Sequence, residues 1–153
     1  MSSSPPISSL SAHLGFWLRY VSNHVSHAFA AKLAALDVTV AEWVMMRALY
    51  DKAPMAPSRL AADMGVTRGA VTKLADRLIA KALVVRRANR DDKRAQTLAL
   101  TPRGVDLTPV LAALADLNDA EVFAHLSPSE RDTLERLLKG LIEAHHMTAI
   151  PID

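Results

Sequence analysis

Apolar residues recur at helical spacing over residues 10–36, near the beginning of the chain. Trp17, Val21 and Val25 lie four positions apart, and Leu14 and Leu18 fit the same side. Side chains three or four positions apart share one face of a helix, so the segment is predicted to be helical. The helix would exceed the length of about 10 to 14 residues that is usual in small domains, and its apolar face needs a partner surface. Residues 1–9, small and polar with two prolines, are predicted to form a mobile arm.

A second helix and a helix-turn-helix are predicted after this long segment. Thr39 and Glu42 have the spacing of a capping box, in which each side chain satisfies a backbone N–H, and the helix they open should reach about residue 51. A short helix that carries Leu60 should end at Gly65, because glycine adopts the left-handed conformation easily. Thr67 then follows as the N-cap of another helix, expected to end near residue 81.

The helix after Thr67 has two chemically different faces. Val71, Leu74 and Leu78 fall on one side. The other side carries five small or polar residues: Arg68, Gly69, Thr72, Lys73 and Asp76. A helix that buries one face and presents Arg, Thr and Lys on the other suits the major groove of DNA. An ordinary amphipathic surface helix gives the same pattern, so the following segment decides between the two interpretations.

A basic hairpin follows this helix and favours the DNA-binding interpretation. Residues 83–87 and 96–100 are β-prone, and residues 88–94 between them form a polar tip. A two-stranded hairpin is marginal alone, so it must lean on helices, as the wing of a winged helix does. Thr101 and Pro102 then open a helix to about residue 123, which Pro109 should kink or break near Leu107. A capping box at Ser127 opens the last helix.

The predicted fold class is mainly α with a small β-hairpin, a winged helix-turn-helix with N- and C-terminal dimerisation helices. We expect a single domain over residues 1–153. Within it, residues 40–101 form the winged helix-turn-helix DNA-binding lobe, and residues 10–36 and 102–147 form the dimerisation helices. The leucine-rich C-terminal helices and the long N-terminal helix are both too apolar to be left in water, which favours a homodimer.

Composition excludes several classes of protein. The 153 residues include no cysteine, so disulfide scaffolds, thiolate zinc sites and thiol redox sensing are excluded. No apolar run approaches the roughly 20 residues needed to span a bilayer, and the N-terminus lacks the basic and apolar regions of a secretory signal. We therefore expect no membrane partner and a cytoplasmic location.

Charge is concentrated on the predicted DNA-binding segment. Residues 58–103 carry eleven Lys or Arg against four Asp or Glu, a balance of +7, whereas the remainder carries seven against twelve, a balance of −5. A local excess of positive charge is the electrostatic footprint that the phosphate backbone of double-stranded DNA requires.

The segment after the second helix of the helix-turn-helix resembles a known signature. Asp92 and Arg94, followed by Leu100-Thr101 and Gly104, match the D-x-R…L-T-x-x-G pattern of MarR-family winged helix-turn-helix transcriptional regulators. The likeness runs from about residue 10 to 141, although the outer helices match only in pattern. It implies a homodimeric, ligand-responsive regulator, most often a repressor, whose two lobes straddle a near-palindromic operator.

The resemblance also implies roles for individual residues. By position, Arg68, Gly69, Thr72 and Lys73 are expected at base edges and nearby phosphates, and Arg77 at the DNA backbone. In the wing, Arg94 matches the family arginine, and Asp92 would hold its guanidinium by paired hydrogen bonds. Arg90 and Lys93 at the tip could reach the minor groove or its phosphates. The alternative is that Asp92 and Arg94 form an exposed ion pair worth under about 1 kcal/mol.

Effector and metal sites are less distinct in the sequence. Members of the family often bind aromatic or phenolic small molecules between the dimerisation helices and the DNA-binding lobe. The candidates for an aromatic anion here are Trp17, Tyr20, His24, Trp43, Met46 and Arg47; each could equally be an ordinary core or interface residue. His24 with His27, and His145 with His146, raise a metal-responsive regulator as an alternative, but further ligands are missing. We expect no cofactor and no bound metal.

Two other functions compete with a DNA-binding regulator. An enzyme is disfavoured, because no P-loop and no nucleophile or paired-carboxylate cluster can be identified. A winged-helix protein-interaction module without DNA binding is the other alternative, and the basic wing argues against it.

Overall fold

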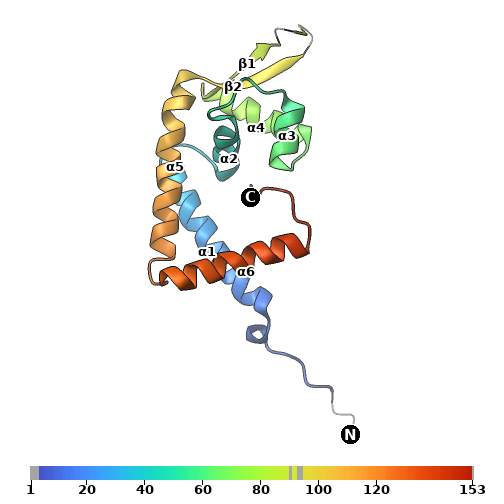
Figure 1. Ribbon diagram of the computed structural model, residues 1–153, viewed down its shortest axis with the longest axis vertical. Helices are drawn as coiled ribbons and strands as arrows, with labels where there is room; N and C mark the ends of the chain where they lie inside the picture. The colour runs from blue at the N-terminus through green and yellow to red at the C-terminus, as the bar shows by residue number, and fades with distance from the viewer. Residues whose placement is uncertain (1–3, 90, 93–94, 153) are drawn as a thin grey trace.

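The computed structural model describes residues 4–89, 91–92 and 95–152 of the chain. These residues form a short 3-10 turn, six α-helices and one two-stranded hairpin (Figure 1). The helices are α1 (Leu14–Ala34), α2 (Val40–Leu49), α3 (Pro57–Met64), α4 (Arg68–Ala80), α5 (Pro102–Val122) and α6 (Pro128–Ala144), and the strands are β1 (Val84–Ala88) and β2 (Gln96–Leu100). The predicted fold class, mainly α with a small hairpin in a winged helix-turn-helix, is confirmed.

The first helix begins later than the apolar pattern suggested. Residues 10–12 form the 3-10 turn, and His13 is extended before α1 starts at Leu14. Trp17 Nε1 donates a hydrogen bond to the Ser11 carbonyl at 2.9 Å, which holds the turn against the first turn of α1.

Local capping signals define the helix-turn-helix. Gly65 ends α3 in the left-handed conformation, with φ of 66°. Thr67 Oγ1 accepts a hydrogen bond from the Ala70 N–H and so caps α4. Thr39 caps α2 in the same way by accepting from the Glu42 N–H. The predicted full capping box at α2 is wrong in one half, since the Glu42 carboxylate turns to Lys81 instead of returning to the backbone.

The hairpin is anchored to the lobe by a third stretch of chain. Strands β1 and β2 are antiparallel, with Val84 opposite Leu100 and Ala88 opposite Gln96. Met55, between α2 and α3, exchanges backbone hydrogen bonds of 2.9 and 2.8 Å with Leu98. This bridge gives the hairpin the neighbouring support that two strands alone would lack.

One hydrophobic core joins the lobe to α1 and α5. Its fully buried side chains come from five helices and the hairpin; Leu33, Met45, Met46, Leu60, Met64, Val71, Ala75, Leu78, Leu98 and Leu111 are among them. Burial of this apolar surface is the main driving force for the fold. Because α1 and α5 share this core and pack along each other, they form a base on which the lobe is mounted (Figure 1).

Helix α5 continues through Pro109, so of the two predicted outcomes the break near Leu107 is wrong, and the kink stays a prediction. Proline removes the hydrogen bond to the carbonyl four residues earlier, which here belongs to Val105. Val105 and Pro109 are both exposed, and water can satisfy that carbonyl. Thr108 Oγ1 also donates to the Gly104 carbonyl at 2.7 Å, in the same turn.

Helix α6 extends away from the core and its tail returns to the lobe (Figure 1). Its capping box is complete, since Ser127 Oγ accepts from the Glu130 N–H and the Glu130 carboxylate accepts from the Ser127 N–H. No described residue of α6 is buried. Beyond it, the Ile150 N–H donates to the Met64 carbonyl at 3.1 Å. Within the described residues, no helix is long and apolar enough to cross a membrane.

Candidate nucleic-acid interface

Helix α4 presents a polar face to solvent because its apolar face is fully occupied. Val71, Leu74, Ala75 and Leu78 are buried against the core. The remaining face carries the five residues predicted to meet DNA; Arg68, Gly69, Thr72, Lys73 and Arg77 are all exposed. A Cβ added at Gly69 would have only the Thr67 hydroxyl nearby, at 3.9 Å. The backbone at Gly69 is therefore open to close approach by a ligand.

The wing and α4 enclose a polar hollow. A cavity of about 450 Å³ is lined by Arg68 and Thr72 from α4, Arg86 and Gln96 from the hairpin, and Ser58 from α3, with apolar neighbours behind them. Two guanidinium groups and two hydroxyls therefore converge from three elements. Donor groups of this kind contact phosphate and sugar oxygens in protein–DNA complexes.

Arg86 is a feature of this site that the sequence analysis missed. Its Nη2 lies 2.5 Å from the Asp76 carboxylate on α4, which braces the wing against the helix. The pattern contained a signal for it. Arg86 pairs with Leu98 across the hairpin, opposite residues share one face of a sheet, and the buried Leu98 identifies that face as the inner one.

The tip of the wing is only partly described. Asn89 N–H donates to the Ala95 carbonyl at 2.9 Å, and Ala95 N–H donates to the Asp92 carbonyl at 3.0 Å, which closes the turn. Asp92 is exposed. Arg90, Lys93 and Arg94 lie outside the described residues, so their predicted contacts and the pairing of Asp92 with Arg94 stay predictions.

The sequence and fold match those of known transcriptional regulators. The MarR family profile matches residues 36–95. The chain is 31% identical over 134 residues to a putative transcriptional regulatory protein for the hcr operon of Thauera aromatica, covering 87% of this chain and 81% of that protein. It is 30% identical over 131 residues to the multiple antibiotic resistance protein MarR of Escherichia coli (strain K12), covering 84% and 90% respectively. The chain belongs to the MarR family.

A structure of this family with DNA has the same fold. A mutant of E. coli MarR complexed with operator DNA matches with a TM-score of 0.75 and 29% identity, over 84% of this chain and 93% of that one. MarR-family proteins are non-enzymatic transcriptional regulators, so this member is a DNA-binding regulator and not an enzyme. The predicted resemblance is confirmed.

The residues predicted to bind an effector are distributed between the core and the surface of this MarR-family chain. Met46 is fully buried in the core, and Trp43 stands edge-on to Phe29 with ring centroids 6.5 Å apart. Arg47 is exposed and lies 5.8 Å from the ring centre of Tyr50. Trp17, Tyr20 and His24 are exposed along α1.

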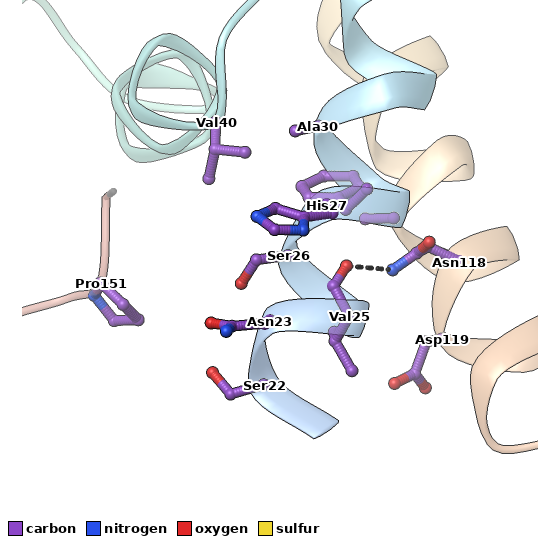
Figure 2. A pocket seen from close by; sticks show the side chains of 12 residues that line it. Ser22, Asn23, Val25, Ser26, His27, Ala30, Val40, Asn118, Asp119 and Pro151 are labelled. Atoms are coloured by element: carbon purple, nitrogen blue, oxygen red, sulfur yellow. Dashed lines mark hydrogen bonds between the residues drawn. The ribbon is translucent and has the colours of Figure 1, made fainter. Parts of the chain in front are cut away.

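A different hollow lies between the base helices and the lobe. A cavity of about 510 Å³ is bordered by α1, α5, the start of α2 and the C-terminal tail (Figure 2). His27 and Ser26 come from α1, Asn118 and Asp119 from α5, and Pro151 from the tail. Asn118 Nδ2 donates to the Val25 carbonyl at 3.3 Å and its Oδ1 accepts from Lys32 Nζ at 3.0 Å, which fixes the amide at the cavity wall. None of the six predicted effector residues borders this cavity.

The histidine pairs are not joined by further metal ligands. Among the described residues, no group of three or more His, Cys, Asp or Glu side chains is close enough to hold a metal ion. The metal-responsive alternative therefore gains no support from the arrangement of His24 with His27 or of His145 with His146.

Proposed function

We propose that this MarR-family regulator acts as a homodimeric repressor that reads a near-palindromic double-stranded operator in the cytoplasm. Arg68, Gly69, Thr72 and Lys73 would meet base edges and nearby phosphates in the major groove, and Arg77 the DNA backbone. The wing would contribute Arg90, Asp92, Lys93 and Arg94 at or beside the minor groove. The observation that carries this proposal is the hollow shared by Arg68 and Thr72 of α4 with Arg86 and Gln96 of the wing.

Exposed apolar surface supports the homodimer. Leu14, Trp17 and Val21 of α1 are half or more exposed, and so is Leu137 of α6. Large exposed apolar patches are rare on monomers and mark interaction sites, so these exposed side chains support a partner on both helices. A two-fold dimer would also bring two copies of α4 to two successive major grooves, whereas one chain grips only one half-site.

The cavity between α1 and α5 supports control by a small molecule. Its volume of about 510 Å³ lies within the usual range of about 300–1,000 Å³ for ligand sites. An occupant would touch the base through His27 and Asn118 and the lobe through Val40. We propose that binding there shifts the lobe relative to the base and releases the operator, with the exposed aromatic residues of α1 as a second candidate surface.

Selection from a random double-stranded DNA library tests the proposal. We expect a two-fold symmetric consensus sequence. We also expect the logarithm of the association constant to fall linearly with the logarithm of the salt concentration. Arg68→Ala should weaken specific binding by about 1–3 kcal/mol if it reads a base, and Arg94→Ala should reduce the salt slope by about one if it meets a phosphate. Arg136→Ala, on the exposed side of α6, is the matched control. Binding independent of salt, or unaffected by Arg68→Ala and Arg94→Ala, would contradict the proposed interface.

A further inference from the structure

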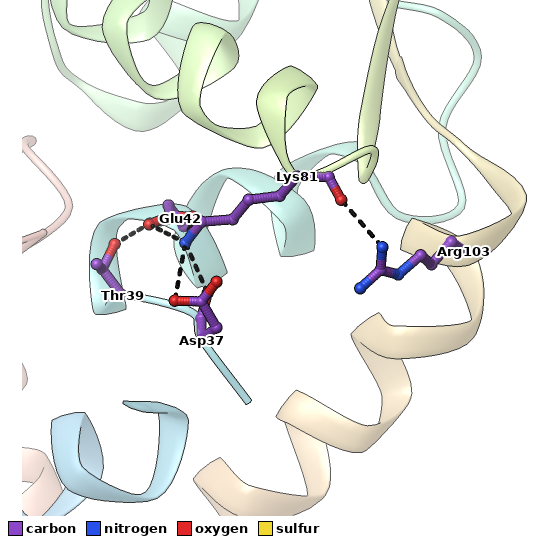
Figure 3. Close-up of polar contacts among 5 residues, drawn as sticks. All are labelled: Asp37, Thr39, Glu42, Lys81 and Arg103. Carbon is purple, nitrogen blue, oxygen red and sulfur yellow. Dashed lines mark hydrogen bonds and ion pairs between the residues drawn. The ribbon is translucent and has the colours of Figure 1, made fainter. Parts of the chain in front are cut away.

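Lys81, the residue that ends the recognition helix α4, connects that helix to the junction between α1 and α2 (Figure 3). Its Nζ donates to the Asp37 carbonyl at 2.6 Å and to Glu42 Oε1 at 3.1 Å, and lies 2.8 Å from Glu42 Oε2. The Asp37 carboxylate is 3.8 Å away. One ammonium group thus ties α4 to the turn that follows the base helix α1 and to the first turn of α2.

The Glu42 carboxylate restricts the arrangement of the Lys81 side chain. Glu42 is 1% exposed, and a buried carboxylate needs a counter-charge with good geometry. Lys81 Nζ donates to Oε1 and to the Asp37 carbonyl, and its contact with Oε2 is an ion pair whose geometry does not meet that of a hydrogen bond. Lys81 is therefore held in one arrangement, because any other would leave a buried charge without compensation.

The same end of α4 is also attached to α5. Arg103 Nη1 donates to the Lys81 carbonyl at 3.3 Å, and Thr101 Oγ1 donates to the Ala82 carbonyl at 2.7 Å (Figure 3 shows the first contact). Ala82 adopts the left-handed conformation, with φ of 58°, which non-glycine residues keep only where surroundings hold it. The C-terminal end of α4 is thus fixed to α2, to the turn that follows α1 and to the start of α5, while its N-terminal end faces the hollow with the wing.

We propose that Lys81 is a positioning residue for operator recognition: held by Glu42 of α2, it bonds to Asp37 in the turn that follows α1, and so sets the orientation of α4 relative to the base and the half-site spacing that the dimer accepts. The inference rests on the proposed homodimer, in which the base helices relate the two lobes. In a two-fold complex, the distance between recognition helices must match the repeat of the DNA helix. Lys81 itself is engaged by Asp37 and Glu42, on the side of α4 away from the proposed DNA contacts, and acts through Arg68, Thr72 and Lys73.

A spacing series tests this role. The selected operator is synthesised with its half-sites at the natural separation and with one or two base pairs added or removed, and dissociation constants are measured for each duplex. The variants are Lys81→Met and the double variant Lys81→Met with Glu42→Met, which replaces both partners by apolar side chains and leaves no buried charge. Lys73→Met removes a predicted direct contact with DNA and serves as the comparison for the Lys81 variants.

The double variant should remain folded and dimeric, and its preference for the natural spacing should fall by about 2- to 30-fold. Its salt slope should stay unchanged, since Lys81 touches no phosphate. Lys73→Met should lower affinity and salt slope on every spacing while keeping the preference. A spacing preference that is unchanged in the folded double variant, or an equal loss on all spacings, overturns the positioning role. If the wild-type chain is monomeric or shows no spacing preference, the result contradicts the proposed dimeric function itself, and not only the positioning role of Lys81.

Discussion

Gly104, in the first turn of α5, has no side chain, and this allows α5 to approach the backbone of Leu83 closely. A Cβ placed there would lie 2.2 Å from the Leu83 carbonyl oxygen, a backbone atom that cannot swing aside. The close approach is stabilised by hydrogen bonds from Thr101, whose N–H donates to that carbonyl and whose hydroxyl accepts from the Gly104 N–H. The contact fastens the start of α5 to the segment between α4 and β1.

Replacement of Gly104 should therefore reverse the usual effect of alanine in a helix. Gly104→Ala is expected to destabilise the fold by about 1–3 kcal/mol through overpacking. Gly69→Ala, in the open first turn of α4, should stabilise it by about 0.5–1 kcal/mol, as alanine normally does. Urea unfolding followed by circular dichroism measures both. Equal stabilisation by the two substitutions would show that α5 does not approach Leu83 as described.

At the scale of elements, the start of α6 combines a cap with a titrating group. Hydrogen bonds from the backbone N–H and the side chain of Ser127 hold the pKa of Glu130 below its ordinary value of 4.5. A carboxyl group whose pKa is lowered on folding stabilises the native state above its unfolded pKa, and this stability is lost as pH falls through the folded pKa. The affected window is therefore below about pH 4.5.

Ser127→Ala should remove this cap and cost about 1 kcal/mol at neutral pH. Glu130→Gln should also lower stability at pH 7, yet it should reduce the difference in stability between pH 7 and pH 3, because the titrating group is gone. Thermal unfolding across that range is the measurement, with Thr133→Ala, an exposed position further along α6, as the control. A Glu130→Gln variant with an unaltered acid dependence would contradict the assignment.

The elements divide into those that local sequence could predict and those that required distant partners. Thr67, Thr101 and Ser127 cap the helices they were predicted to cap, because an N-cap depends on residues two or three positions away. The same logic failed for the Glu42 side chain, whose partner Lys81 is 39 positions distant. Capping rules consider only neighbours in the sequence. They could not predict that the Glu42 carboxylate would bind Lys81 from another helix instead of the backbone N–H of Thr39.

The candidate DNA site shows the same division. The exposed face of α4 was predictable from periodicity alone, since Val71, Leu74 and Leu78 define the buried side. Strand alternation places Arg86 on the same face as the buried Leu98, but its contact with Asp76, and the position of Gln96 in the hollow, depend on how the hairpin packs on α4, which spacing does not encode. A site between the dimerisation helices and the lobe was expected from the family resemblance, but the lining residues of the α1–α5 cavity were not predicted, because Asn118 and Pro151 reach it from segments far apart in the chain.

At the scale of the whole molecule, α6 has many apolar residues and little to cover them. Leu137, Leu138, Leu141 and Ile142 fall on one side of the helix, and Leu141 and Ile142 are each 48% exposed. The tail beyond α6 returns to the lobe at Met64, so the helix is attached at both ends but uncovered along its length. A second copy that covers this face would remove the apolar surface from water.

The proposed dimer interface can be tested without damage to the fold of the single chain. Leu141→Glu places a charge on the exposed apolar side of α6, and no residue of that helix is buried within one chain. The monomer should therefore fold normally, as circular dichroism can verify. In the dimer the carboxylate would be desolvated without a partner, so the dimer dissociation constant should rise by about 100-fold or more. Sedimentation equilibrium measures it.

Arg136→Glu, on the opposite side of α6, is the matched control and should leave the dimer intact. Operator affinity should fall with Leu141→Glu, since a monomer grips one half-site, and single half-site binding should be retained because α4 and the wing are untouched. A Leu141→Glu variant that stays dimeric at micromolar concentration would place the interface elsewhere. A monomeric variant with full operator affinity would show that DNA recognition does not require the dimer, which would contradict a mechanism with two coupled lobes.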